Sequence, residues 1–506
     1  MTDNESFQVY LNLANDLFDG QIPEDGLSPA VKQLPHLDKQ LLDRLAAQAE
    51  NFALTTPRRS WAIAQVADAA ADSQNRDVFL QSLAAWYLGR ACNHWTQPQR
   101  VNKAISRARQ GFKELNEDGW VAACDWQINI LSWTKTDFIQ SEHELQQALV
   151  GLHATGLTEF VPHCGLALSY VQILVGKYEQ ARENISTSEA YFLDRGDLLN
   201  QARCWLNEAS LYRRQVLFDQ ASDRLTKALN VFEGQNARLD VAKAKYQLAL
   251  LHLLRTDDLS IAISNFNQAI EIFSKCDLDL WEAACKTNLG SIYLQAGQLA
   301  QTEACYQEAR QSFTQHNVLG LLADNLNDGG KLNLLKGLPE ISIEQYKQAE
   351  EIYKKLGATL AIALEATNLG EAYGQMGRYQ DALHHLERAA DQLKLIGHSL
   401  HLGTCEMYMA QVWSQLGQPA LAHEHLNKAA TCYEDSKQKA LFSFIYNSRA
   451  RIYFDQGQTT NGIDWLKKSL VVAEQHGFRP QIALAHRLLG ETLVSSGHLK
   501  EGRMHL

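Results

Sequence analysis

The sequence has little of what a membrane-spanning, secreted or nucleic-acid-binding protein needs. No uninterrupted apolar run reaches the ~18 residues of a membrane span. The opening residues, MTDNESFQVYLNLANDLFDGQ, lack the basic start and apolar core of a secretory signal. The formal net charge of -11 is the opposite of the Lys and Arg excess that neutralises phosphates. We therefore expect a cytoplasmic protein that binds no membrane and no nucleic acid.

Proline is also scarce, with 9 among 506 residues. This favours long helices, because proline interrupts the helical hydrogen-bond ladder. The hydrophobic share of 45% is that of a folded chain rather than a disordered one. The chain is too long for one ordinary hydrophobic core, so we expect several domains or an array of repeats.

The sequence lacks the common motifs of catalysis and metal binding. It contains no C-x-x-C, no H-E-x-x-H, no G-x-S-x-G and no P-loop motif. We therefore predict no catalytic residue, no metal site and no cofactor. One basic run is present, and we interpret it as a solvated helix face rather than as a phosphate site. Its members are Arg90, Arg100, Lys103, Arg107, Arg109 and Lys113.

What the sequence does contain is a repeat. The segments TNLGSIYLQAGQ, residues 287–298, and TNLGEAYGQMGR, residues 367–378, share the frame N-L-G-x-x-Y-x-x-x-G. Gly330 lies 40 residues after Gly290 and 40 before Gly370. When this 40-residue spacing is continued in both directions, with one inserted residue, it falls on a small residue in every unit except one, where Asn129 stands. The small residues are Gly89, Ser169, Ala209, Ala249, Gly290, Gly330, Gly370, Ala410, Ala450 and Gly490.

Each unit then continues in a second fixed pattern. A glycine follows the small residue by seven positions, as at Gly297 and Gly377. A small, a large and a small residue come next, as at Ala382, Leu386 and Ala389. Spacings of three and four on both sides of a glycine predict two amphipathic helices joined by a glycine-capped turn. One such pair cannot bury its own apolar face, so neighbouring pairs must stack.

This pattern resembles the tetratricopeptide repeat. The family's small residue at its eighth position matches Gly290 and Gly370, and its aromatic at the eleventh matches Tyr293 and Tyr373. The family's usual terminal proline is missing, and the period is 40 rather than the usual ~34 residues. The chain thus looks like a long-helix subtype of the family.

The resemblance implies an all-α fold, a right-handed α-solenoid of about eleven stacked helix-turn-helix units. We expect the solenoid over residues 76–506, with its last unit incomplete, and an N-terminal helical cap with a connector over residues 1–75. Five cysteines share one repeat position, and we interpret them as core packing rather than as disulfides. They are Cys124, Cys164, Cys204, Cys285 and Cys405.

One polar column gives candidate binding residues, two positions before the small residue of each unit. In the family that the chain resembles, the first helices line a concave groove, and a carboxamide there can both donate to and accept from a peptide backbone. The same side chains could instead bond neighbouring helices, and both interpretations stay open. The column is Gln127, Asn207, Gln247, Asn288, Asp328 and Asn368. Weaker candidates near the same face are Trp126, Trp133, Arg213, Arg214 and Arg451.

Two functional hypotheses follow from the resemblance. The first is a non-catalytic scaffold that holds a peptide or protein segment in its concave groove. The second is a sensor array of a larger effector, because long arrays of this kind resemble those joined to CHAT-type caspase-like peptidases or to signal-responsive regulators in bacteria. The chain ends inside a predicted second helix, so we expect either a further domain beyond residue 506 or a partner that caps this end.

Overall fold

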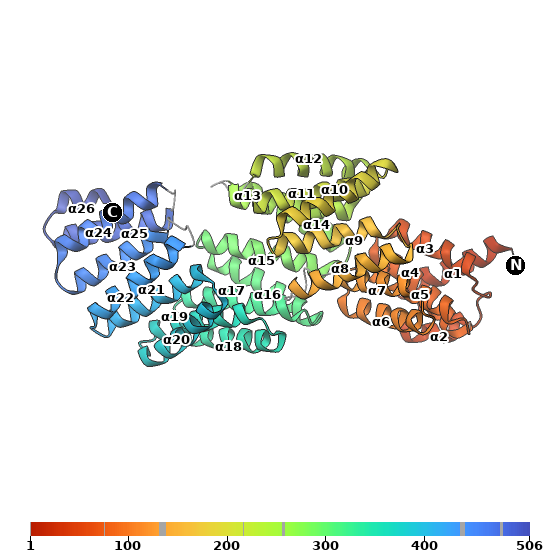
Figure 1. The fold of residues 1–506 in the computed structure, drawn as a ribbon, viewed down its shortest axis with the longest axis horizontal. Coiled ribbons are helices and arrows are strands. Elements are labelled where there is room, and N and C mark those ends of the chain that lie inside the picture. The colour runs from red at the N-terminus through yellow and green to blue at the C-terminus, as the bar shows by residue number, and fades with distance from the viewer. Residues whose placement is uncertain are drawn as a thin grey trace. The chain divides into compact units, whose positions relative to one another are not determined.

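The protein is described by a computed structural model in which every regular element is a helix (Figure 1). The described residues are 2–74, 76–130, 138–215, 217–255, 259–435, 441–475 and 479–505. The all-α prediction is therefore confirmed for these ranges. None of the helices described there is long and apolar enough to cross a membrane. The chain divides into two compact units, Met1–Asn325 and Leu326–Leu506.

The chain begins with five helical segments, and side-chain caps specify the starts of two of them, α1 and α3. A capping box formed by Thr2 and Glu5 starts the first helix, and the carboxylate of Asp38 accepts the Leu41 N–H at the start of α3. The segments are α1 (Asp3–Phe18), the short 3-10 helix η1 (Glu24–Gly26), α2 (Leu27–Val31), α3 (Lys39–Phe52) and α4 (Pro57–Gln74). The expected boundary at residues 75 and 76 stays a prediction.

The rest of the first unit consists of helix pairs. The sequence period reappears in them, because α11, α13 and α15 begin at Leu198, Arg238 and Asp279. The pairs are α5 (Val78–His94) with α6 (Pro98–Glu114), α7 (Asp118–Asn129) with α8 (Phe138–Thr155), α9 (Val161–Leu174) with α10 (Tyr178–Asp194), α11 (Leu198–Arg214) with α12 (Phe218–Gly234), α13 (Arg238–Arg255) with α14 (Ser260–Lys275), and α15 (Asp279–Gln295) with α16 (Leu299–Gln315).

The second unit continues the same arrangement, and the boundary between the units falls inside α17. Its pairs are α17 (Leu319–Leu335) with α18 (Pro339–Leu356), α19 (Thr359–Gln375) with α20 (Tyr379–Ile396), α21 (Ser399–Gln415) with α22 (Pro419–Asp435), α23 (Phe442–Asp455) with α24 (Thr459–Gln475), and α25 (Arg479–Ser495) with α26 (Leu499–His505). The described residues from α5 onward thus form eleven pairs, as the repeat pattern predicted.

The predicted glycine turns and close helix contacts are confirmed. Gly297 and Gly377 follow their helices with φ of 72° and 73°, a left-handed conformation in which a glycine avoids the strain of a Cβ atom. At Gly290, a Cβ atom would lie only 2.5 Å from Cε1 of Tyr306, a buried residue on the second helix of the pair. At Gly89, Gly330 and Gly370, as at Gly290, the small residue of the first helix therefore receives a large side chain of the second.

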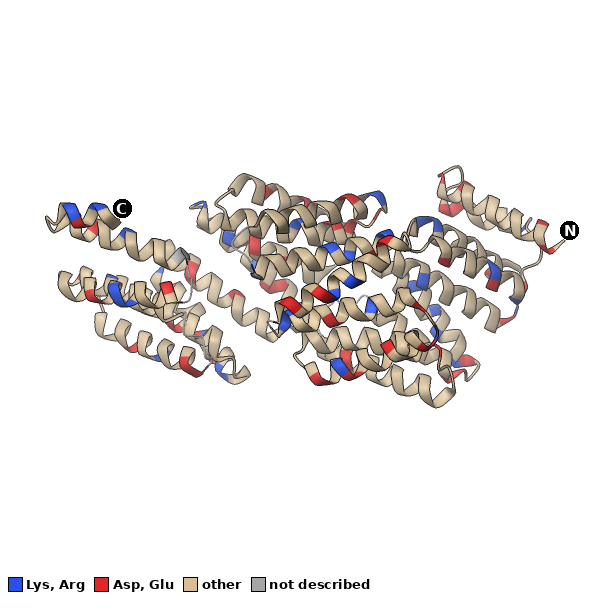
Figure 2. Cartoon of the chain, turned by 90° about the horizontal axis from the view of Figure 1, so that it is seen from above, with Lys and Arg blue, Asp and Glu red and all other residues tan. Residues whose placement is uncertain are grey.

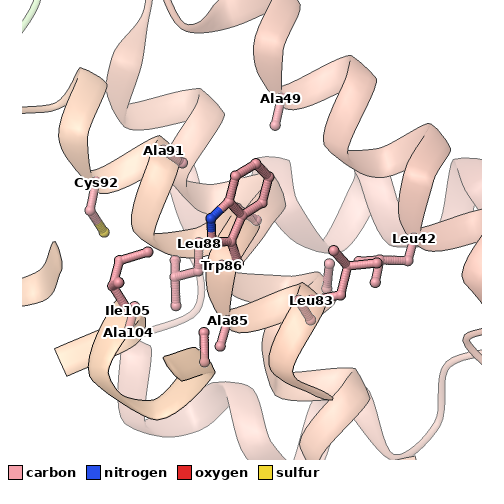
Figure 3. Close-up of a cluster of buried hydrophobic side chains, with 14 of the residues drawn as sticks. Leu42, Ala49, Leu83, Ala85, Trp86, Leu88, Ala91, Cys92, Ala104 and Ile105 are labelled. Carbon is pink, nitrogen blue, oxygen red and sulfur yellow. The ribbon is translucent and has the colours of Figure 1, made fainter. Parts of the chain in front are cut away.

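Aromatic and aliphatic side chains also join the first segments to the array. Trp86 on α5 is 1% exposed and lies among Leu42 and Ala49 of α3 and Ile105 of α6 (Figure 3). The indole is large enough to fill the space that the small residues around it leave. Helix α3 is thereby packed into the same core as the first pair.

Replacing Gly290 with alanine should lower the free energy of unfolding by about 1–3 kcal/mol, because the added methyl group overlaps the ring of Tyr306. Denaturant unfolding followed by circular dichroism measures this change. Gly234 is a matched control, because a Cβ atom there would meet nothing within 4 Å. The same change at Gly234 should cost nothing, and equal losses in both variants would contradict the close contact.

Candidate functional site

The first unit contains a cavity of about 620 Å³, which we call the central cavity. Its wall is formed by the first helices of six successive pairs, α5, α7, α9, α11, α13 and α15, together with the end of α3. This volume lies within the ~300–1,000 Å³ that is usual for ligand sites. One face of several first helices therefore borders a single, half-open space.

A set of contacts between segments distant in the sequence lies beside this space, which Leu54 and Thr96 of those segments line, and we call this set the seam. It brings residues 53–58 and 95–99, which are turns and the helix starts that follow them, against residues 237–239, 276–277 and 316. Repeat units normally contact only their neighbours, so the sequence period could not predict it.

The seam consists of a few directional bonds. The Leu239 N–H donates to the carbonyl of Leu54 at 3.2 Å. The indole N–H of Trp95 donates to the carbonyl of Asp277 at 3.1 Å. The amide of Gln99 donates to the carbonyl of His316 at 3.1 Å. Most of these bonds end on backbone carbonyls, so they depend on the position of the turns more than on residue type.

The predicted polar column partly meets at the central cavity. Gln127, Asn207 and Gln247 all line it. The amide of Asn93 donates to Oε1 of Gln127 at 2.7 Å, and the amide of Asn207 donates to Oγ of Ser169 at 3.1 Å. These bonds link neighbouring first helices, so the interpretation as interhelical bonding is confirmed for both residues. A role in ligand binding stays a prediction.

The other members of the column lie in different surroundings. Asn288 donates to the hydroxyl of Tyr246, which lines the cavity, at 3.3 Å. Asp328 and Asn368 belong to the second unit, where Asp328 accepts from the ammonium of Lys331 at 3.2 Å. The structure thus brings together three of the six predicted side chains around one space.

The charged groups in the cavity wall are mostly paired. Arg90 approaches Oε1 of Glu50 at 2.9 Å, and Arg203 donates to Oδ2 of Asp240 at 2.8 Å. Burial opposes the ionisation of Asp240, but Arg203 and Lys243 hold the pKa of its carboxyl below the usual value. Both carboxylates therefore already have a cationic partner within the protein.

The sequence reasoning missed Arg203 and Lys243. Each precedes a predicted amide, Asn207 or Gln247, by four residues and so lies on the same helix face one turn away. Inspecting that neighbouring position would have found both. The weaker candidate Trp126 does line the cavity, whereas Trp133 lies outside the described residues.

Aromatic rings form much of the remaining wall, and His163 stands among them. Its ring lies 6.1 Å from that of Trp126 and 5.0 Å from that of Phe192. Burial, together with the positive charges of Arg203 and Arg90, lowers the pKa of His163 to about 4. This histidine is therefore neutral at physiological pH.

The cysteines are packed in the core as expected, whereas arginines of the basic run are ion-paired and Arg90 lines the central cavity rather than a solvated face. Figure 2 shows basic and acidic residues interspersed along the helices of each unit. Four arginines of the run form ion pairs, namely Arg90 with Glu50, Arg100 with Glu24, Arg107 with Asp68 and Asp72, and Arg109 with Asp125.

The five cysteines of the repeat column are fully buried and free. Burial raises the pKa of the Cys164 thiol to about 12, which keeps it protonated.

The second unit has a cleft of its own, of about 420 Å³, between α19, α21 and α23. Glu371, Gln411 and the weaker candidate Arg451 line it. In the part of the chain that the structure describes, no three His, Cys, Asp or Glu side chains gather in a way that could hold a metal ion.

His163 should make stability depend on pH. Its pKa of about 4 lies below the ~6.5 of an unfolded chain, so protonation favours unfolding. The stabilisation is complete above about pH 6.5 and is lost as the pH falls toward 4. His163→Gln should therefore reduce, by about 2 kcal/mol, the loss of unfolding free energy between pH 7 and pH 4.5. His143→Gln, at an exposed site on α8, should not, and equal pH dependence in both variants would refute the assignment.

Two protein families match parts of the chain. The tetratricopeptide repeat family matches residues 359–435, and the soluble NSF attachment protein family, SNAP, matches residues 179–373. No curated protein matches the chain significantly.

Several solved structures are similar to the chain at low sequence identity. A Rap protein complexed with competence and sporulation factor has a TM-score of 0.50 and 14% identity, covering 68% of this chain and 95% of its own. Aspartyl phosphate phosphatase F from Bacillus subtilis has a TM-score of 0.45 and 13% identity, covering 67% and 91%. A STAND protein with a tetratricopeptide repeat sensor from Pyrococcus horikoshii has a TM-score of 0.40 and 12% identity, covering 92% and 67%.

Of these three, the Rap protein complex reaches a TM-score of 0.50, and at 14% identity it supports the fold alone. The family match at residues 359–435 falls on α19 to α22, two of the helix pairs that the repeat pattern predicted. The stacked pairs, the glycine turns and the small-to-large contacts extend the same design along the described chain. Residues 359–435 thus match the tetratricopeptide repeat family, and the described helix pairs on either side share its stacked helical architecture.

Proposed function

We propose that this chain is a non-catalytic binding module whose central cavity captures a short segment of a partner protein or a short peptide. The observation that carries the proposal is the seam, because beside it one face of six first helices lines a single cavity rather than an extended groove. An open groove would suit a long extended ligand, whereas a cavity of about 620 Å³ suits a ligand of a few residues.

The chemistry of the wall fits a polypeptide. Trp126, Tyr246 and Trp281 offer apolar ring surface, and Asn200 and Gln247 offer amides beside it. Oε1 of Gln247 is buried and has no hydrogen-bond partner among the described residues. A peptide N–H can satisfy such an acceptor, and each bond of this kind adds ~0.5–1.5 kcal/mol.

Filling the cavity should abolish binding. Ala284 on α15 lines it, and Ala284→Trp would occupy much of its volume. Selection from a random hexapeptide library should enrich peptides on the natural chain and should fail on this variant. Ala304→Trp is the matched control, because Ala304 is exposed on the neighbouring helix α16. Equal enrichment on both variants would place binding elsewhere.

A second candidate is a sensor array that regulates a larger effector. The seam favours it, because the contacts beside the cavity join segments far apart in the sequence. A ligand that touches α5 on one side and α13 on the other should stabilise these contacts. Ligand binding would then increase the stability of the contacts in the seam.

Hydrogen exchange tests the sensor candidate. The Leu239 amide donates across the seam, whereas the Asp197 amide donates within its own turn to Phe192 at 2.9 Å. A peptide selected on the natural chain should slow exchange at Leu239 at least about tenfold, because opening the seam then also requires loss of the ligand. Exchange at Asp197 should change little. Equal slowing at both amides, or none, would leave no role for the seam in signalling.

A further inference from the structure

The cleft of about 420 Å³ in the second unit, which we call the second-unit cleft, has more acidic than basic residues in its wall. The wall consists of the first helices of three successive pairs, α19, α21 and α23. Its charged residues are the acids Glu371 and Asp455 and the single cation Arg451. Among the described residues none of the three forms an ion pair. The negative charge of this wall is therefore not neutralised by a direct partner.

Glu371 is the acid of the wall that burial affects most. Burial raises the pKa of its carboxyl, although a hydrogen bond from the hydroxyl of Tyr408 and the charge of Lys331 both oppose this. Lys331 does not line the cleft, and its ammonium is already bound by Asp328 at 3.2 Å. The carboxylate of Glu371 therefore lacks a cation of its own, and a cation in the cleft would offset the cost of its burial.

Aromatic rings and amides surround this carboxylate. Tyr379 and Tyr408 line the same cleft, and a cation is attracted to the face of an aromatic ring. An amide can both donate to and accept from a peptide backbone. The amides of the wall are those of Gln375, Gln411 and Gln415. The cleft thus offers an acceptor for a charged group and hydrogen-bonding partners for the backbone that carries it.

We propose that the second-unit cleft is a second binding site, separate from the central cavity, and that it receives a lysine or arginine side chain from a segment of a partner protein. The carboxylate of Glu371 accepts hydrogen bonds from the ammonium or guanidinium group of this side chain. Its aliphatic stem lies against the rings of Tyr379 and Tyr408. The amides of the wall bond the flanking backbone, which a free diamine would leave unused.

The net charge of the whole chain acts in the same direction. A formal charge of -11 attracts a basic segment at long range and so speeds its approach. Such a field acts on any cation and does not select the site. Selection therefore depends on Glu371, and the exposed cation Arg451 in the same wall opposes it. Removing these two charges should change the affinity in opposite directions.

Library selection on the Ala284→Trp chain, in which the central cavity is filled, tests the inference. The enriched hexapeptides should contain lysine or arginine. A peptide enriched in this way should bind about tenfold more weakly after Glu371→Gln, because the amide keeps the shape of the carboxylate but not its charge. It should bind about twofold more tightly after Arg451→Gln, because a like charge is removed. Fluorescence anisotropy measures both changes.

Glu387→Gln is the matched control, because Glu387 is exposed on the neighbouring helix α20 and does not line the cleft. Its affinity for the same peptide should not change. A loss on Glu371→Gln together with a gain on Arg451→Gln would support the inference, since partial unfolding would weaken binding in both. Unchanged helical circular dichroism in each variant shows that it has folded.

Four outcomes would overturn the inference. Enrichment of neutral or acidic peptides would show that the charge of Glu371 is not what the cleft recognises. Binding of spermidine without enrichment of any peptide would make the occupant a free amine. Failure to enrich any peptide or bind spermidine would leave no second site. An equal loss on Glu387→Gln would place recognition outside the cleft. Because the central cavity is filled in all these chains, none of these outcomes bears on the function proposed above.

Discussion

The close approach of two helices at a small residue is the contact on which this structure depends. At Gly330, as at Gly290, the first helix leaves no room for a Cβ atom, because a tyrosine of the second helix, Tyr346 or Tyr306, already fills that space. A larger residue would separate the helices of the pair and expose the face that the next pair covers. Repetition of this contact builds each unit pair by pair, without a single central core.

Stacking by itself makes a surface, and the seam converts part of that surface into a site. Leu54 and Trp95 contact Leu239 and Asp277, so segments distant in the sequence meet beside the first helices of the first unit. The polar groups inside are then constrained by burial. Asn207 is satisfied by a neighbouring helix and Asp240 by Arg203, because unpaired polar groups are costly there. A buried polar atom without a partner in the protein, such as Oε1 of Gln247, can form a hydrogen bond with a ligand.

Capture of a short segment depends on the volume of the central cavity and on apolar rings such as Trp281, rather than on any one charged group. That the protein has no catalytic activity remains a prediction from the sequence. The proposed function requires no catalytic group.

The sequence by itself determined the helix pairs, their period, the glycine turns and the buried cysteine column. These follow from spacings of three, four and seven residues and from local backbone conformation, which a chain specifies over short distances. Only the tertiary structure decided the seam and the cavity. Trp95 and Asp277 are 182 residues apart, and their contact depends on how small rotations between successive pairs add up. The sequence period is the same in each unit, so it contains no information about the summed rotation. It therefore indicated Gln127 and Asn207 but could not indicate which residues lie opposite them in the cavity.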